Sequence, residues 1–324
     1  MHQTNNFLFK SLNNAQLKAV NHINGPLLVV AGAGSGKTKA LTHRIANLIE
    51  NNSVDPYNIL AVTFTNKAAK EMKGRLQVLL AQEIALNQFG QPWSTLKEFD
   101  QNQLRTNIDL ERLRDLWIGT FHALFSRLLR YDIEKYQDPE GLTWTRQFSI
   151  YDETDSQTLV KEIVSQDMCL DPKRFDPKKI KRAISNAKNQ CFTANDLEEK
   201  ADNHFDKIIA DAYRRYRRSL SKNNALDFDD LLLLPVFLLR QNDLVRDYWH
   251  KRFQHVLVDE YQDTNRTQYE LIKLITAGNT EPNKFCEWND RSIFVVGDAD
   301  QSIYSFRAAD FRILIGFQED FKNS

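Results

Sequence analysis

Short apolar runs alternate along the chain with stretches of helical periodicity. The clearest runs cover residues 27–31, 59–64, 256–258 and 293–296, and a weaker fifth run covers residues 116–120. They are apolar at consecutive positions, as are strands of a parallel sheet that is covered on both faces. After the first, the second and the weaker run, apolar residues recur three and four positions apart, which indicates amphipathic helices. This alternation predicts an α/β fold, in which helices cover both faces of a parallel sheet.

The strand signals fade between residues 131 and 224. This segment is polar, charged and helical in pattern, and Asp-Pro pairs interrupt it. We expect it to be a mostly helical subdomain inserted into an α/β domain made of residues 1–130 and 225–324. A further interruption at residues 82–114 is longer than an ordinary connection needs, and the sequence leaves open whether it is a helical elaboration or a mobile loop.

Composition narrows the class of protein. The 324 residues are 42% apolar and 27% charged, which fits a globular chain of about two domains. Its 43 basic and 43 acidic residues balance, so any nucleic-acid contact must come from local patches. The longest apolar run, residues 231–239, is short and contains Pro235, so we expect no membrane partner. Three widely spaced cysteines without a Cys-x-x-Cys pair fit a cytoplasmic protein.

A glycine-rich loop joins the first predicted strand to a helix. Residues 32–38 run Gly-Ala-Gly-Ser-Gly-Lys-Thr, and Ala31 stands where the pattern usually has glycine. This is the context of a P-loop, whose backbone N–H groups and helix N-terminus surround phosphate oxygens. Lys37 would meet the β- and γ-phosphates of ATP, and the Thr38 hydroxyl would bind Mg²⁺. The residues assigned to nucleotide binding here are Ala31, Gly32, Ala33, Gly34, Ser35, Gly36, Lys37 and Thr38.

Two carboxylates follow the predicted strand at residues 256–258. Asp259 would hold Mg²⁺ through its water shell, and Glu260 would orient the attacking water and accept its proton. An acidic pair at a strand end can also be a solvated cap. Together with the P-loop, however, the pair predicts phosphoryl transfer from ATP to water, with charge stabilised by Lys37 and the metal.

P-loops serve kinases, transporters, GTPases and motors, so the nucleotide alone does not define the function. Seven motifs do more, and they are Leu12-Asn-Asn-Ala-Gln16, the P-loop, Thr63-Phe-Thr-Asn-Lys-Ala-Ala-Lys-Glu-Met72, Gly119-Thr-Phe-His122, Leu226-Asp-Phe-Asp-Asp-Leu231, Val258-Asp-Glu-Tyr-Gln-Asp-Thr-Asn265 and Gly297-Asp-Ala-Asp-Gln-Ser-Ile-Tyr304. From residue 12 to about residue 317, the chain resembles the superfamily 1 DNA helicases of the UvrD, PcrA and Rep type. The resemblance implies a RecA-like P-loop NTPase motor domain (1A) with a 1B-like helical insertion.

The resemblance also implies roles for single side chains. Gln16 would recognise the adenine of ATP, because a carboxamide both donates and accepts hydrogen bonds. Gln301 would contact the γ-phosphate or the attacking water, and it joins Lys37 and Glu260 in the expected catalytic set. Two further residues are expected to help couple the nucleotide state to DNA: Gln262 and Asp263.

For single-stranded DNA, the resemblance points to aromatic rings and polar groups that follow strands. These candidates are Phe64, Thr65, Asn66, Thr120, Phe121, His122, Tyr304 and Phe306. A phenylalanine beside a strand is also a common core residue. Relatives usually have Trp in place of Phe306, so the grip on DNA at that point is expected to be weaker. Basic clusters at residues 173–188 and 214–222 are either duplex-phosphate contacts or solvated charge runs.

The family's second motor domain supplies arginines that complete the ATP site, and this chain ends before such a motif. Arginines of this kind contribute roughly 10³ to 10⁵ to turnover in related systems. We therefore expect a 3′–5′ DNA helicase motor half, acting in repair or replication, that binds ATP, Mg²⁺, single-stranded DNA and single/double-strand junctions. Alone it would hydrolyse ATP slowly, and a C-terminal motor domain or chain would be its partner. The alternatives are an ATP-gated DNA-binding or regulatory module that does not unwind, and half of a helicase–nuclease complex.

Overall fold

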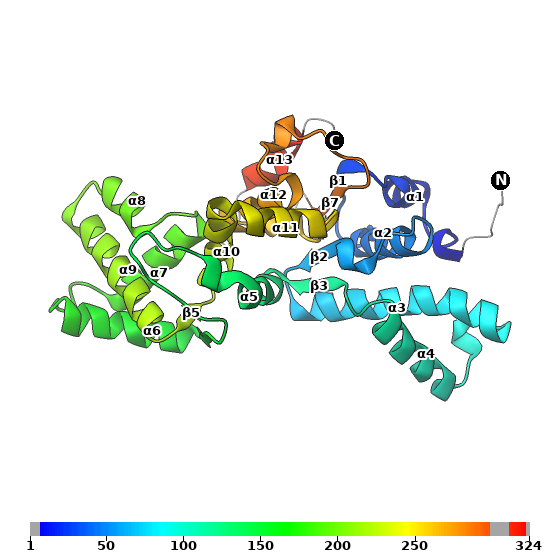
Figure 1. Cartoon of the computed structure of the whole chain (residues 1–324), viewed down its shortest axis with the longest axis horizontal. Helices are drawn as coiled ribbons and strands as arrows, with labels where there is room; N and C mark the ends of the chain where they lie inside the picture. Colours follow the sequence, from blue (N-terminus) through cyan, green and yellow to red (C-terminus); the bar gives the residue numbers. More distant parts are fainter. Residues whose placement is uncertain (1–6, 299–310, 322–324) are drawn as a thin grey trace.

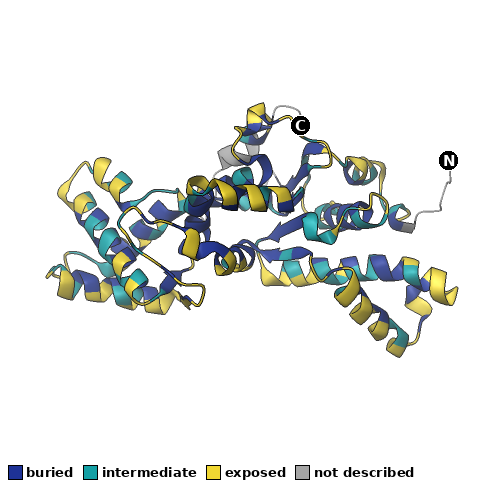
Figure 2. Ribbon diagram, viewed as in Figure 1, coloured by how far each residue is buried: buried dark blue, intermediate teal, exposed yellow. Residues whose placement is uncertain are grey.

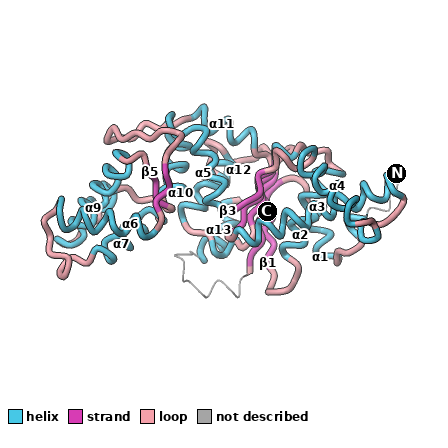
Figure 3. The backbone as a smooth tube through the Cα atoms, turned by 90° about the horizontal axis from the view of Figure 1, so that it is seen from below, coloured by secondary structure: helices cyan, strands magenta, loops and turns pink. Residues whose placement is uncertain are grey.

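A parallel five-stranded sheet forms the centre of the chain (Figures 1 and 3). The structure, a computed structural model, describes residues 7–298 and 311–321. In spatial order the strands are β1 (Gly25–Val30), β7 (Ser292–Gly297), β6 (His255–Val258), β2 (Ile59–Thr63) and β3 (Trp117–Thr120). All five strands expected from the apolar runs are present, including the weaker one. The predicted α/β fold class is therefore confirmed.

Successive residues of the inner strands contribute to two different cores. In β2, Leu60 and Val62 belong to one core, whereas Ile59 and Ala61 belong to the other. The helices of the first core are α5 (Phe121–Asp132), α10 (Asp230–Gln241), α11 (Asp243–Arg252), α12 (Arg266–Ala277) and α13 (Phe311–Asp320). Those of the second are α1 (Asn14–Asn21), α2 (Lys37–Glu50), α3 (Asn66–Phe89) and α4 (Glu98–Glu111). Burial on both faces explains the continuous apolar runs (Figure 2).

A helical body is inserted between α5 and α10, at the opposite end of the molecule from α3 and α4 (Figure 1). Its helices are α6 (Glu153–Glu162), α7 (Pro177–Asn189), α8 (Ala194–Glu199) and α9 (His204–Lys222). They bury a core of their own around Ile180, Ile184, Tyr213 and Tyr216. Two short parallel strands close its base: β4 (Ser149–Tyr151) and β5 (Ala225–Asp227). The mostly helical insertion is thus confirmed, while the domain limits at residues 131 and 224 stay a prediction.

The segment at residues 82–114 is helical rather than a loop. Helix α3 continues to Phe89 and ends at Gly90, whose φ of 65° is the left-handed conformation that glycine adopts at helix ends. Helix α4 then packs back on α3, so the two form an arm beside the sheet (Figure 1). Within the described ranges, no helix is both long and apolar enough to cross a membrane.

A buried cluster of charges fixes the insertion to the α/β domain. The Lys188 ammonium of α7 lies 2.9 Å from Asp227 Oδ2 and 2.8 Å from Asp230 Oδ1, and Lys188 is fully buried. Burial and the charge of Asp227 raise the pKa of Asp230 to about 6. Burial also opposes ionisation of Asp227, but Lys188 and Lys181 outweigh it and lower the pKa of Asp227 to about 2. Lys188 is therefore a structural cation at the base of the insertion.

Candidate nucleotide and DNA site

The carboxyl ends of the strands lie level with one another. The parallel register pairs Val30 with Gly297, and Val258 with both Val62 and Val295. In open α/β sheets, ligands bind at this edge. The glycine-rich loop after β1, the acidic pair after β6 and the aromatic residue after β2 consequently share one side of the sheet.

The loop after β1 has the backbone geometry of a phosphate cradle. Gly34 and Gly36 have φ values of 75° and 84°, which side chains rarely adopt. A Cβ atom at Gly36 would also lie 2.5 Å from the Gln16 side-chain nitrogen. Helix α2 starts directly after Gly36 and no side chain caps it, so its first N–H groups are open to an anion. A cavity of about 400 Å³ covers this loop, lined by Ala33, Gly34, Ser35, Gly36, Lys37, Thr38, Lys39, Arg75 and Glu260.

Lys37 spans the mouth of the loop and reaches the neighbouring strand end. Its ammonium donates to the Ala31 carbonyl at 2.7 Å and lies 3.1 Å from Asp298 Oδ2. Both side chains of the ion pair are at least nine-tenths buried. Asp298 was not among the residues predicted for the site, because nothing in the sequence shows that β7 lies beside β1.

Thr38 and Asp259 lie together as expected for a magnesium site. The Thr38 hydroxyl donates to Asp259 Oδ2 at 3.3 Å. Burial and the charge of Glu260 raise the pKa of Asp259 to about 6. Hydroxyl and carboxylate oxygens are ligands that Mg²⁺ accepts alongside water and phosphate. Among the described residues no group of three or more His, Cys, Asp or Glu side chains could form an all-protein metal cage.

Gln16 contacts the loop from α1. Its side-chain nitrogen donates to the Ser35 carbonyl at 3.0 Å, and its side-chain oxygen accepts from the Asn13 N–H in the cap of α1. The residue therefore helps to hold the phosphate loop in place. Adenine recognition by Gln16 stays a prediction.

A second cavity, of about 270 Å³, opens beside the ends of β2 and β3. It is lined by Thr63, Phe64, Phe121, His122, Asn189, Asp229, Leu232, Asp263, Asn265 and Gln268. Phe64 is half-buried, and its ring meets that of Phe121 edge to face at 5.4 Å. The cavity thus brings three of the predicted DNA residues together: Phe64, Phe121 and His122.

Phe121 requires a correction. It is 1% exposed and stacks on Phe125 in the core, so its ring has no free face for a base. Its contribution is to support Phe64 from behind. The neighbouring His122 is only partly buried, and burial lowers its pKa. Its ring lies 5.8 Å from that of Phe228, an aromatic residue that is 51% exposed and was not predicted for DNA contact.

The polar candidates of this surface are placed at helix starts. Thr65 caps α3 by accepting from the Ala68 N–H, and Thr120 caps α5 in the same way. Thr65 and Asn66 are exposed, whereas Thr120 is buried. Three further predicted residues lie outside the described part of the chain: Gln301, Tyr304 and Phe306.

The two basic clusters divide once their partners are known. Lys181 is nearly buried and pairs with Asp229, and Arg217 is buried against Asp138. These cations serve the fold. Exposed cations for which the structure records no carboxylate partner among the residues it describes are Lys173, Arg174, Lys178, Lys179 and Arg182.

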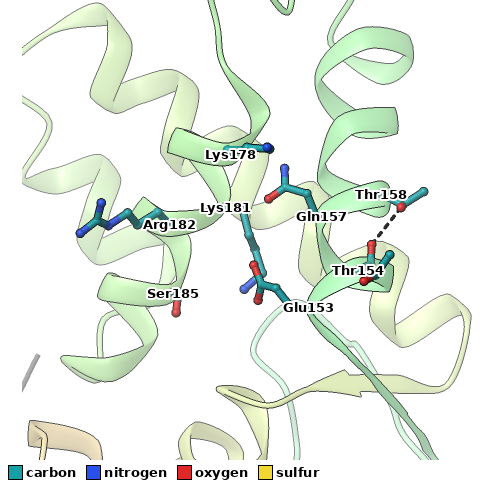
Figure 4. Close-up of a pocket in the computed structure, with 8 residues that line it drawn as sticks. All are labelled: Glu153, Thr154, Gln157, Thr158, Lys178, Lys181, Arg182 and Ser185. Carbon is teal, nitrogen blue, oxygen red and sulfur yellow. Dashed lines mark hydrogen bonds between the residues drawn. The ribbon is translucent and has the colours of Figure 1, made fainter. Parts of the chain in front are cut away.

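Some of these cations line a cavity of about 580 Å³ between α6 and α7 (Figure 4). Its lining is Glu153, Thr154, Gln157, Thr158, Lys178, Lys181, Arg182 and Ser185. Lys181 points into the space between the two helices, whereas Arg182 points away from it (Figure 4). The insertion therefore carries exposed positive charge on α7, while most of the arginines of α9 are paired with carboxylates.

The sheet, the phosphate loop and the acidic pair define a P-loop ATPase site of the helicase type. The chain belongs to the UvrD/REP helicase N-terminal domain family, whose model matches residues 12–322. Among curated proteins, it is 40% identical over 316 residues to an ATP-dependent DNA helicase PcrA of Staphylococcus epidermidis. It is 39% identical over 316 residues to a protein of the same name from Staphylococcus aureus. These alignments cover 98% of this chain and 37% of each relative.

Proposed function

We propose that this chain forms the ATP-hydrolysing motor domain of a DNA helicase or translocase, with 3′–5′ polarity by family resemblance. One observation carries the proposal, namely the position of β6 between β7 and β2. Because of it, the acidic pair after β6 is flanked by Asp298 on one side and by Phe64 on the other. ATP chemistry and base contact then occupy adjoining ends of one sheet.

The proposed reaction is attack of water on the γ-phosphorus of ATP, which gives ADP and phosphate. The N–H groups of the loop and of α2 bind the phosphates, and Lys37 leaves Asp298 to meet the β- and γ-phosphates. Glu260 orients the water and accepts its proton. Mg²⁺, held by Thr38 and through water by Asp259, supplies charge neutralisation.

In this proposal, single-stranded DNA crosses the ends of β2 and β3. A base stacks on Phe64, while Thr65, Asn66 and the starts of α3 and α5 hold phosphates. Exposed cations of α7 contact duplex phosphates at a single/double-strand junction. We place this activity in the cytoplasm, in DNA repair or replication.

Two variants test the assignment separately. Lys37→Ala should lose ATP binding and keep nucleotide-free DNA binding, because its ammonium serves only the phosphates. Phe64→Ala should keep ATP binding and lose about 1 to 3 kcal/mol of single-strand affinity. Phe99→Ala, on α4 and 76% exposed, is the matched control. Fluorescent-ATP titration and oligonucleotide anisotropy measure both, and unchanged binding in both variants would refute the proposal.

A second function is favoured by the Lys37–Asp298 ion pair, which links the phosphate site to the end of β7. Through this contact, ATP could gate DNA affinity without any unwinding. A duplex with a 3′ single-stranded tail separates the two functions. A helicase releases the displaced strand, whereas a gated binding module changes its affinity with ATP and leaves the duplex intact.

A further inference from the structure

Gln262 is a buried amide between the ends of β6 and β7. It follows the acidic pair in a short 3₁₀ turn, Tyr261–Asp263, and is 2% exposed. Its side-chain oxygen accepts from the Asp298 N–H at 2.9 Å, and its nitrogen donates to Glu260 Oε2 at 2.8 Å. The orientation of the amide is fixed by chemistry, because an N–H group requires the oxygen and a carboxylate requires the NH₂ group.

Glu260 needs such a partner. Its backbone has φ 50° and ψ 45°, a left-handed conformation that costs a non-glycine residue about 1 to 2 kcal/mol. The turn that follows holds this backbone, since the Asp263 N–H donates to the Glu260 carbonyl at 2.9 Å. Among the described residues, Gln262 provides the hydrogen bond that fixes the carboxylate itself.

We propose that Gln262 is a positioning residue for ATP hydrolysis, which rests on the proposed role of Glu260 as general base. One end of its amide aims the Glu260 carboxylate at the attacking water. The other end ties it to Asp298, the residue that pairs with Lys37. Departure of Lys37 towards the phosphates is thereby coupled to the placement of Glu260.

Metal-fluoride complexes of ADP test this role without depending on turnover. With Mg²⁺, ADP–aluminium fluoride mimics the transition state including the in-line water, whereas ADP–beryllium fluoride mimics bound ATP. Gln262→Met should weaken the aluminium fluoride complex about 10- to 100-fold and leave the beryllium fluoride complex within about twofold. Gln262→Glu should show the same split, because it retains the acceptor for Asp298 and places a carboxylate against Glu260.

Two controls separate the possible failures. Gln82→Met removes another buried amide, one that accepts from the Trp93 N–H in the α3–α4 arm, and should leave both affinities unchanged. Glu260→Gln should reproduce the split, and if it does not, the proposed general base is wrong. If Glu260→Gln shows the split but Gln262→Met lowers both affinities equally, or neither, the positioning role is overturned while the proposed function stands.

Discussion

Replacing Lys188 with methionine tests the account of how the insertion is held. The ammonium contacts two buried carboxylates at 2.8 and 2.9 Å, and the side chain is fully buried. Removing one partner of a buried ion pair costs about 3 to 5 kcal/mol. Asp227 would retain Lys181 at 3.8 Å and the Tyr216 hydroxyl at 2.9 Å. We therefore expect the lower end, about 3 kcal/mol at pH 8.

The pH dependence of this loss has a defined sign. In the natural chain the pKa of Asp227 is lowered, so its contribution is present above about pH 4 and is lost as the pH falls towards 2. Without Lys188, burial raises the pKa of both carboxylates above their unfolded values. The folded variant then takes up protons on acidification, and its deficit should shrink by about 1 kcal/mol or more between pH 8 and pH 5.

Urea unfolding followed by circular dichroism, at pH 8 and pH 5, measures both effects. Lys179→Met is the matched control, because Lys179 lies on the same helix, is exposed and should shift stability by less than about 0.5 kcal/mol. A Lys188→Met deficit no larger than that of the control, or one that grows on acidification, would refute the reasoning.

Three further predictions follow from single observations. Gly36→Ala should abolish ATP binding in calorimetry, because the φ of 84° and the 2.5 Å approach of Gln16 exclude a Cβ; Gly74→Ala, in open space on α3, should not, and equal binding by both would contradict this. Burial lowers the pKa of His255 to about 4, so up to about 3 kcal/mol of stability, present above pH 6.5, should be lost towards pH 4; His255→Asn should flatten that slope in urea titrations. Lys178→Gln with Arg182→Gln should reduce the log–log salt slope of junction binding by about 1 per phosphate contact, and an unchanged slope would return these exposed cations to the solvent.

Features encoded by local pattern could be predicted from the sequence. The five strands are continuous apolar runs because both faces of the sheet are covered, and the glycine-rich loop requires positive φ at Gly34 and Gly36. One local pattern was less informative. The run 231–239 with Pro235 was noted as a short, broken stretch, yet it lies within α10, a buried helix packed between α5 and α12.

Features that depend on distant partners could not be predicted. Lys37 meets Asp298, which is 261 residues away, and Lys188 meets Asp227, which is 39 residues away. A basic cluster therefore looks the same in sequence whether its cations face solvent or a buried carboxylate. Phe64 and Phe121 both follow strands, but only the packing of α5 decides that the second ring is closed off in the core.

The central claim is that ATP occupancy and grip on DNA are coupled through adjoining ends of one sheet. Titration of a labelled single-stranded oligonucleotide, with and without a non-hydrolysable ATP analogue and Mg²⁺, measures that coupling directly. The account predicts two clearly separated binding curves for the natural chain and a single shared curve for Lys37→Ala. Curves for the natural chain that superimpose, at nucleotide concentrations shown to saturate the site, would contradict it.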